Sequence, residues 1–349
     1  MLSPILNGLS FFFRLAVGCR RLLYDWGVFR VHRLNCPVIC VGNLTVGGTG
    51  KTPIVECLAR ELAMRNCRVA ILSRGYGGKS TKRHLFCKKW PRVVSDGSRV
   101  LLNGEEAGDE PFMLAKNLKG VVIISHRDRV KAARMAVNDY GCNMLILDDG
   151  FQYLKLHKQA SILLLDKSNP LGNGRLLPRG SLREPISAMR RATHIILTRA
   201  DVEANESLKI LLEKHSTAPC MESCLIAEEL RDSGGKTSTP LKALKGKRVA
   251  IFSGIANPKS FEDSIHATGA YIVLKRRFPD HYSFRASEIA QFFEETVDLR
   301  AEMIITTEKD MARLPACMTD VLPTFYLRIR AKITNGLDIW ENFLCALHK

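Results

Sequence analysis

Residues 41–53 read VGNLTVGGTGKTP, a glycine-rich segment that follows a short apolar run. Its end, Gly-Lys-Thr at 50–52, matches the G-K-[ST] of a phosphate-binding loop. The first glycine of the pattern G-x-x-x-x-G-K-[ST], however, falls on Thr45. Gly47 can supply the flexibility that the turn needs, because glycine adopts backbone angles that other residues disfavour. The segment therefore predicts a phosphate-binding loop with a substituted first position.

The chemistry of this segment suits ATP. Backbone N–H groups of a glycine-rich turn can face an anion, and a helix that begins near Lys51 adds the positive end of its dipole. Lys51 can reach the β and γ phosphates, and the Thr52 hydroxyl can ligate Mg²⁺. The alternative is a glycine-rich turn without a ligand. The expected ATP-binding residues are Thr45, Val46, Gly47, Gly48, Thr49, Gly50, Lys51 and Thr52.

Apolar runs of strand length alternate with longer segments from Pro37 onward, and Ile54, Leu58 and Leu62 are spaced as on one helix face. Continuous apolar strands between helices indicate a mostly parallel sheet that is covered on both faces. We therefore expect an α/β fold with a P-loop NTPase-like sheet. The runs are 37–41, 69–73, 121–125, 144–147, 161–165, 194–197, 248–255, 271–274, 303–307 and 324–333.

A change of composition divides the chain. Residues 232–247 are rich in Gly, Ser, Thr, Pro and Lys, as is typical of a connection between domains. We expect an N-terminal segment over 1–35, a P-loop domain over 36–240 and a smaller α/β domain over 241–349. A length of 349 residues allows two ordinary domains.

The chain is strongly basic, with 52 Lys and Arg against 35 Asp and Glu, a net charge of +17. Such an excess favours an anionic partner, which can be a phosphorylated substrate, an acidic membrane surface or nucleic acid. A hydrophobic content of 46% excludes a disordered chain. The 11 cysteines include no C-x-x-C pair, so we expect reduced thiols of a cytosolic compartment and no cysteine metal site.

The N-terminus combines apolar and basic residues. Residues 2–13 are largely apolar and include three consecutive phenylalanines, and arginines follow at 14, 20 and 21. The run is too short and too interrupted for a spanning helix, which needs about 20 apolar residues. Two interpretations remain: a helix in a membrane interface with its arginines among anionic head groups, or a first helix that packs on the core with a solvated basic face.

Asp148 and Asp149 directly follow the apolar run 144–147. A carboxylate at the end of a strand beside a phosphate loop can orient Mg²⁺. The alternative is a simple turn, since Asp-Asp-Gly favours turns.

Two further sites carry acid–base residues. Asp109 and Glu110 precede a proline. This pattern is typical of a helix start, and the alternative is that the two acids form a functional site. His281 beside Asp280 follows the run 271–274 and is a candidate base or a surface histidine. The segment 306–310, TTEKD, is faintly similar to the N-K-x-D base reader of GTPases, but with the wrong spacing.

Seven motifs occur in an order typical of one family, so the sequence resembles the tetraacyldisaccharide 4'-kinases, the lipid A 4'-kinases of Gram-negative bacteria. The resemblance covers nearly the whole chain, and a threonine or serine at the position of Thr45 is a feature of that family. The motifs are VGNLTVGGTGKTP, SRGYGG (73–78), GDEP (108–111), LDDGFQ (147–152), LLPRGSLREP (176–185), FPDH (278–281) and TTEKD.

The resemblance implies ATP- and Mg²⁺-dependent phosphorylation of the 4' hydroxyl of a tetraacylated glucosamine disaccharide 1-phosphate. It implies action at the cytoplasmic face of the inner membrane, on whose anionic surface the N-terminal helix would lie. By the motifs, Lys51 would act on the phosphates, and Asp109 and His281 would form a base dyad on the sugar hydroxyl. The implied metal residues are Thr52, Glu110, Asp148 and Asp149, with Gln152 beside them.

This sequence departs from the family pattern at three positions. Tyr153 stands where DDGFQH has histidine, so it can keep a hydrogen bond but not a cation. Arg179 and Ser181 stand where a small residue and a proline are expected. These departures leave the roles of Tyr153 and of the segment 176–185 open.

Two other functions fit parts of the sequence. A phosphate-loop ATPase or GTPase that acts as a switch would turn over nucleotide without an acceptor lipid. A nucleic-acid-binding protein would use the basic excess, but no nucleic-acid motif accompanies it and the N-terminus is apolar. We therefore expect no nucleic acid as partner, and no protein partner follows from the sequence.

Overall fold

The glycine-rich segment 44–50 joins a buried strand, β1 (Val38–Asn43), to a helix, α2 (Lys51–Met64). Gly50 caps this helix with φ 75°, a left-handed angle that glycine adopts without strain. Gly42 is needed for a close approach, because a Cβ there would lie 2.7 Å from the Cβ of Phe151. The strand and helix on either side of the segment are therefore as the sequence predicts.

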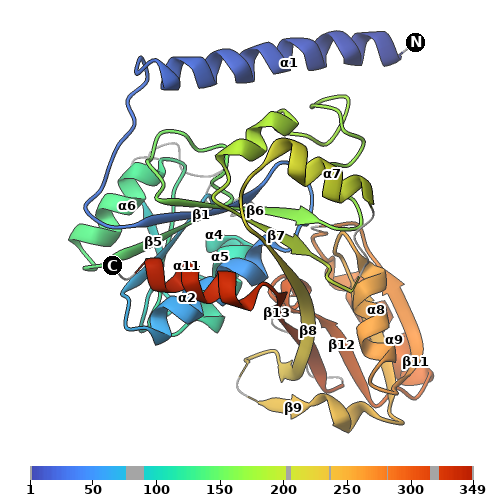
Figure 1. Cartoon of the computed structure of the whole chain (residues 1–349). Coiled ribbons are helices and arrows are strands. Elements are labelled where there is room, and N and C mark those ends of the chain that lie inside the picture. The colour runs from blue at the N-terminus through green and yellow to red at the C-terminus, as the bar shows by residue number, and fades with distance from the viewer. Residues whose placement is uncertain are drawn as a thin grey trace.

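The computed structural model describes residues 2–75, 90–201, 206–235, 237–280, 282–314 and 322–347 (Figure 1). The helices other than α2 are α1 (Leu2–Asp25), α4 (Gly104–Ala107), α5 (Asp109–Asn117), α6 (Arg129–Asn138), α7 (Glu206–His215), α8 (Pro258–His266), α9 (Ala286–Asp298), α10 (Glu308–Met311) and α11 (Leu337–Ala346), with short 3-10 helices η2 (Ile186–Arg191) and η3 (Leu241–Leu244).

The described strands form one sheet in the order β11-β10-β12-β13-β8-β7-β6-β1-β5-β2-β4-β3, and β9 pairs with β8. The remaining strands are β2 (Val69–Ser73), β3 (Arg92–Asp96), β4 (Val122–Ser125), β5 (Met144–Asp148), β6 (Ala160–Asp166), β7 (His194–Thr198), β8 (Cys220–Asp232), β9 (Ser238–Pro240), β10 (Arg248–Ser253), β11 (Tyr271–Arg277), β12 (Met303–Thr307) and β13 (Thr324–Asn335).

Two groups of parallel strands make up most of this sheet, and β3 and β9 pair antiparallel at its margins with β4 and β8. The first runs from β8 to β4, and the second runs from β11 to β13. The long strands β8 and β13 pair antiparallel and join the two groups. The prediction of a mostly parallel α/β sheet is thus confirmed, and the sheet continues across the predicted domain boundary at 240–241. That boundary stays a prediction.

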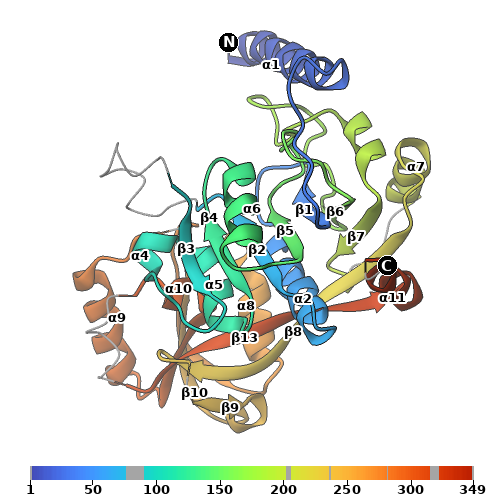
Figure 2. The same ribbon diagram turned by 90° about the vertical axis from the view of Figure 1, so that its left-hand side faces the viewer.

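Helices cover both faces of the first strand group. On one face, Ile54, Leu58 and Leu62 of α2 are fully buried, in a cluster that also holds Trp340 and Phe343 of α11. Each such buried side chain stabilises the fold by roughly 1.5–3 kcal/mol. Figure 1 and Figure 2 show α11 beside α2, so the end of the chain returns to the helix that follows the glycine-rich turn.

The helix α1 lies on the outside of the molecule, over the loops that follow β6 (Figure 1 and Figure 2). Ser10 donates to the carbonyl of Leu176 at 3.0 Å and accepts from the N–H of Arg179 at 3.1 Å. Arg20 donates to the carbonyl of Gln152 at 3.3 Å. These polar contacts are long-range, so α1 rests on the segment 176–185 and on the segment after β5.

Candidate active site

The carboxyl ends of the parallel strands carry most of the polar residues of the candidate site. Asn43 ends β1, Ser73 ends β2, Asp148 ends β5 and Thr198 ends β7. All four are buried. Because these strands are parallel, their ends meet at one edge of the sheet, where open α/β sheets bind ligands. The glycine-rich turn leaves β1 at the same edge.

Lys51 extends over this edge from the first turn of α2. Its Nζ donates to the side-chain oxygen of Asn43 at 3.3 Å and lies 3.8 Å from Oδ1 of Asp149. Thr52, the next residue, is buried, with only 3% of its surface exposed. Sequence reasoning found Lys51 and Thr52 but missed Asn43, which carries no signal beyond its place at the end of an apolar strand.

The glycine-rich turn is held from the side by the segment 176–185. The N–H of Val46 donates to the carbonyl of Ser181 at 2.8 Å, and the N–H of Arg183 donates to the carbonyl of Leu44 at 2.7 Å. Thr49 is 7% exposed, and its hydroxyl oxygen has no hydrogen-bond partner among the residues that the structure describes. Buried polar groups normally have a partner, so this hydroxyl is suited to a ligand.

The two acids at the end of β5, Asp148 and Asp149, differ in their electrostatics. Burial, together with the carboxylates of Glu110 and Asp149, raises the pKa of Asp148 to about 7. Burial acts in the same direction on Asp149, but the cations of Lys51 and Arg183 outweigh it and lower the pKa of that carboxyl. Arg183 donates to both oxygens of Asp149, at 2.9 and 2.8 Å. Adjacent carboxylates in unlike environments can take different roles.

The donor set at this edge fits magnesium. Thr52, Asp148 and Asp149 present hydroxyl and carboxylate oxygens, the ligands that Mg²⁺ prefers. Within the described ranges, no three His, Cys, Asp or Glu side chains form a preformed metal cage. Mg²⁺ does not need one, since it is usually held by one or two carboxylates together with phosphates of the substrate.

Asp109 and Glu110 open α5, as the helix-start interpretation predicts, and both pair with basic residues on or beside α10. Arg313 Nε donates to Asp109 Oδ2 at 2.7 Å. Lys309 Nζ donates to Glu110 Oε1 at 2.9 Å. The structure therefore brings the two acids to the second strand group, and Arg313 is a partner that sequence reasoning missed.

His281 lies outside the described residues, and so do 76–78 of the motif SRGYGG. The residues before His281 are placed: a Cβ at Gly254 would lie 3.2 Å from the carbonyl oxygen of Pro279. The turn after β10 also approaches the glycine-rich segment, since a Cβ at Gly48 would lie 3.9 Å from that of Ala256. The start of FPDH thus lies in the part of the second strand group that faces the first.

Gln152 and Tyr153 have structural partners. Gln152 Nε2 donates to the carbonyl of Asn43 at 2.9 Å. The Tyr153 hydroxyl donates to Asp128 at 3.1 Å and accepts from the N–H of Arg129 at 3.0 Å. The ring lies 5.5 Å from the guanidinium carbon of Arg129. The tyrosine at the usual histidine position therefore keeps hydrogen bonds and positions the start of α6.

The segment TTEKD does not read a base in this fold. Asp310 is fully buried, and its carboxylate accepts from the N–H of Gly254 at 2.9 Å and from the Thr307 hydroxyl at 2.6 Å. A base-reading aspartate needs an accessible carboxylate. The switch-GTPase alternative therefore lacks its nucleotide-base contact here.

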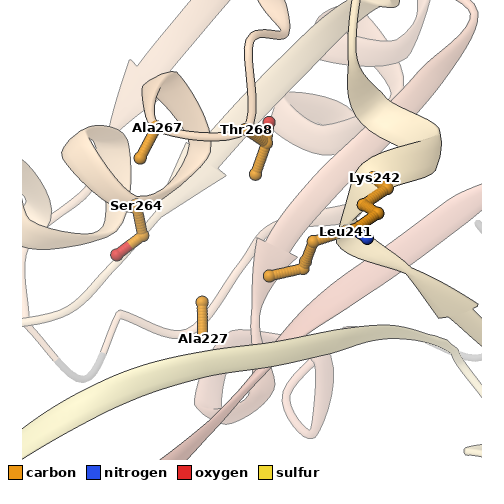
Figure 3. A pocket seen from close by; sticks show the side chains of 6 residues that line it. All are labelled: Ala227, Leu241, Lys242, Ser264, Ala267 and Thr268. Atoms are coloured by element: carbon orange, nitrogen blue, oxygen red, sulfur yellow. The ribbon is translucent and has the colours of Figure 1, made fainter.

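A cavity of about 420 Å³ lies elsewhere, between β8, η3 and α8 (Figure 3). None of its lining residues was predicted for the site. They are Ala227, Leu241, Lys242, Ser264, Ala267 and Thr268.

The N-terminal helix exposes apolar side chains. Phe11 is 59% exposed and Phe12 is 67% exposed, and Ile5, Leu9 and Leu15 are also exposed. Among the described helices, none has the length and apolar character to cross a membrane. For these exposed residues the core-packing interpretation of the N-terminus is wrong, whereas Leu6, Phe13 and Val17 of the same helix are partly buried.

Comparison with known proteins points to one family. The family model described as tetraacyldisaccharide-1-P 4'-kinase (LpxK) matches residues 2–347. The chain is 42% identical over 337 residues to the tetraacyldisaccharide 4'-kinase of Anaeromyxobacter dehalogenans strain 2CP-C, covering 94% of this chain and 86% of that protein. It is 39% identical over 343 residues to that of Syntrophus aciditrophicus strain SB, covering 94% and 89%.

A solved structure has the same fold. The crystal structure of LpxK from Aquifex aeolicus in complex with ATP superposes with a TM-score of 0.80 at 32% identity, covering 99% of each chain.

Proposed function

The chain belongs to the tetraacyldisaccharide 4'-kinase family, and we propose how its residues carry out the reaction. It is an ATP-dependent lipid A 4'-kinase. The acceptor is the 4' hydroxyl of a tetraacylated glucosamine disaccharide 1-phosphate. The bond between the γ-phosphorus and the bridging oxygen of ATP breaks, a bond to the sugar oxygen forms, and the hydroxyl proton leaves. Such a transfer depends on positioning and charge neutralisation.

Residues 45–52 are proposed to be the phosphate-binding loop. The observation that supports this most is the buried Thr49 hydroxyl, which lacks a protein partner in the described chain and lies just before the helix that Lys51 begins. The positive end of the α2 dipole and the Lys51 ammonium both favour phosphate at this position. Asn43 and Asp149 hold the ammonium over the sheet edge.

Thr52, Asp148 and Asp149 would hold Mg²⁺, with Glu110 as a further candidate. When bound, Mg²⁺ neutralises charge on the β and γ phosphates and orients them. Arg183 holds Asp149 in place through two hydrogen bonds, so that carboxylate has a fixed direction. Ser73 donates to Asp148 at 3.4 Å.

Asp109 and His281 are proposed as the groups that take the proton of the sugar hydroxyl. A sugar hydroxyl is a poor nucleophile at neutral pH, and a positioned base contributes about 10²–10⁴-fold. Asp109 lies at the start of α5 beside residues of the second strand group. If 36–240 and 241–349 move as two domains, their closure would assemble the two groups and exclude water.

The helix α1 is proposed to lie in the cytoplasmic face of the inner membrane. Its exposed phenylalanines suit the boundary of the acyl chains, and its arginines suit anionic head groups. Contacts of Ser10 and Arg20 with loops beside the site would keep an acylated acceptor close to the phosphate loop.

A transfer assay tests this function. The protein is incubated with γ-labelled ATP, Mg²⁺ and a tetraacylated disaccharide 1-phosphate in detergent micelles, with and without the acceptor. We expect label on the 4' position and little ATP turnover without acceptor. ATP or GTP turnover that ignores the acceptor would instead support a switch NTPase.

A further inference from the structure

Arg313 joins three segments that are far apart in sequence. Its guanidinium donates to Asp109 Oδ2 at 2.7 Å, to Asp310 Oδ1 at 3.3 Å and to the carbonyl of Gly254 at 3.3 Å. The side chain is only 8% exposed. A buried guanidinium with carboxylate partners on two sides has a fixed orientation, because its planar donors must match both.

Asp310 fixes Arg313 from behind. It is fully buried and accepts from the Gly254 N–H and from the Thr307 hydroxyl, in addition to its pairing with Arg313. Thr307 also caps α10 by accepting from the Asp310 N–H at 3.2 Å. Through these contacts the segment TTEKD supports Arg313 and joins it to the turn at Gly254.

The helix α10 is in turn fixed to the helix of the phosphate loop. Glu308 accepts from Arg328 at 2.9 Å and from the Asn117 amide at 2.6 Å. Arg328 also donates to Glu56 of α2, and the Arg328 side chain is 2% exposed. Buried ion pairs of Arg328 therefore join the start of α10 to the helix that begins at Lys51, and Arg313 joins the same region to the start of α5. Removing one partner of such a pair leaves a buried charge, which is costly.

We propose that Arg313 is a positioning residue for the reaction, which holds the Asp109 carboxylate in the direction needed at the acceptor hydroxyl. This rests on the proposed role of Asp109. Arg313 occupies one oxygen of the carboxylate and limits its rotation. A catalytic group displaced by about 1 Å can cost about 10²-fold in rate.

The test compares Arg313→Met and Arg313→Lys with Asp109→Asn and the double variant Asp109→Asn/Arg313→Met. Arg65→Met is the matched control, since Arg65 also pairs with carboxylates at 2.6 and 2.7 Å but at the far end of α2. We measure kcat, the KM for ATP and for the acceptor, and the thermal midpoint.

We expect kcat of Arg313→Met to fall about 10- to 100-fold. The KM for ATP should change by less than about threefold, because Arg313 is not assigned to the phosphates. Arg313→Lys should recover part of the loss, and Arg65→Met should keep wild-type kinetics. In the Asp109→Asn background, Arg313→Met should cost little more, since residues that act as a unit are non-additive.

Three outcomes overturn the inference. If Asp109→Asn is impaired while Arg313→Met keeps kcat within about twofold, Arg313 does not position Asp109 and the proposed function stands. If Arg313→Met lowers kcat by the same factor in the wild type and in Asp109→Asn, Arg313 does not act through Asp109. If Asp109→Asn itself is active, the proposed role of Asp109 fails and the inference fails with it. If Arg313→Met does not fold, the same comparison is made with Arg313→Lys in the wild type and in Asp109→Asn.

Discussion

Lys51 and Asp149 face each other at the carboxyl edge of the sheet, with Nζ 3.8 Å from Oδ1. One begins the helix after the glycine-rich turn, and the other follows β5 with a left-handed φ of 50°. Such an angle is uncommon for a non-glycine residue and persists where the surroundings fix the residue, and Arg183 holds the Asp149 side chain here. The pair thus joins the proposed phosphate loop to the proposed metal site.

The first prediction concerns the phosphate loop. Lys51→Ala and Thr52→Ala should each lower kcat by about 10²-fold or more, because each removes a contact to the transferring phosphates. Circular dichroism and the thermal midpoint check the fold. Lys247→Ala, which removes an exposed pair with Glu302, is the control. Near wild-type rates in a folded Lys51 or Thr52 variant would contradict the loop assignment.

The second prediction concerns the metal. Asn at position 148 or 149 should raise the Mg²⁺ concentration needed for half-maximal rate by about 10-fold or more. The measurement is a Mg²⁺ titration of the rate at fixed, saturating ATP. Arg183→Lys should give a smaller increase, because it weakens the support of Asp149 and leaves the carboxylate. Unchanged titrations in both aspartate variants would move the metal site toward Glu110.

The third prediction concerns the N-terminal helix. Deleting residues 1–21 should move the protein from the membrane fraction to the soluble fraction. Phe11→Ser with Phe12→Ser should do so in part, since it removes two exposed apolar side chains and keeps the arginines. Fractionation at low salt and flotation with anionic vesicles measure both. Intact protein found wholly in the soluble fraction at low salt would be inconsistent with membrane binding.

The fourth prediction concerns acid stability near the FPDH segment. Glu262 of α8 accepts from Arg277 at 2.6 Å and from Lys275 at 3.2 Å, at the end of the strand that leads into FPDH. The hydrogen bond from Arg277 outweighs burial and, with Lys275, lowers the pKa of Glu262 from 4.5 to about 2. A lowered folded-state pKa stabilises the fold above the unfolded value, and this contribution is lost as pH falls toward the folded value.

Glu262→Gln should therefore reduce the free energy of unfolding at pH 7, and the difference from wild type should shrink as pH falls below about 4.5. Urea denaturation at several pH values measures it. A difference that stays constant with pH would show that the carboxylate charge is not the cause.

Much of the fold follows from local sequence. Buried parallel strands leave continuous apolar runs, so β1, β2, β5, β6 and β12 are all visible in the sequence. The spacing of Ile54, Leu58 and Leu62 likewise predicts α2. The strand β8 was missed, because its 13 residues mix polar and apolar side chains without regular alternation. The antiparallel pairing of β8 with β13, which joins the two strand groups, could not be predicted for the same reason.

The candidate site was predicted where a motif is local. Lys51 and Thr52 open the helix after β1, and Asp148 and Asp149 lie at the end of β5, so topology alone brings them to one edge. The pairing of Asp109 with Arg313 spans 204 residues, and a single sequence contains no signal for such a contact. Arg183 lies within a predicted motif, but only the structure shows its two hydrogen bonds to Asp149.

In the proposed reaction Asp109 and His281 act together on the acceptor hydroxyl. The most direct measurement is a double-mutant cycle on kcat with Asp109→Ala, His281→Ala and the double variant, with ATP affinity determined in parallel. We expect a steep loss of kcat in each single variant, nearly unchanged ATP affinity, and a double variant little worse than the worse single one. Two small, additive losses would contradict this expectation, and Asp109 would then be only the first residue of α5.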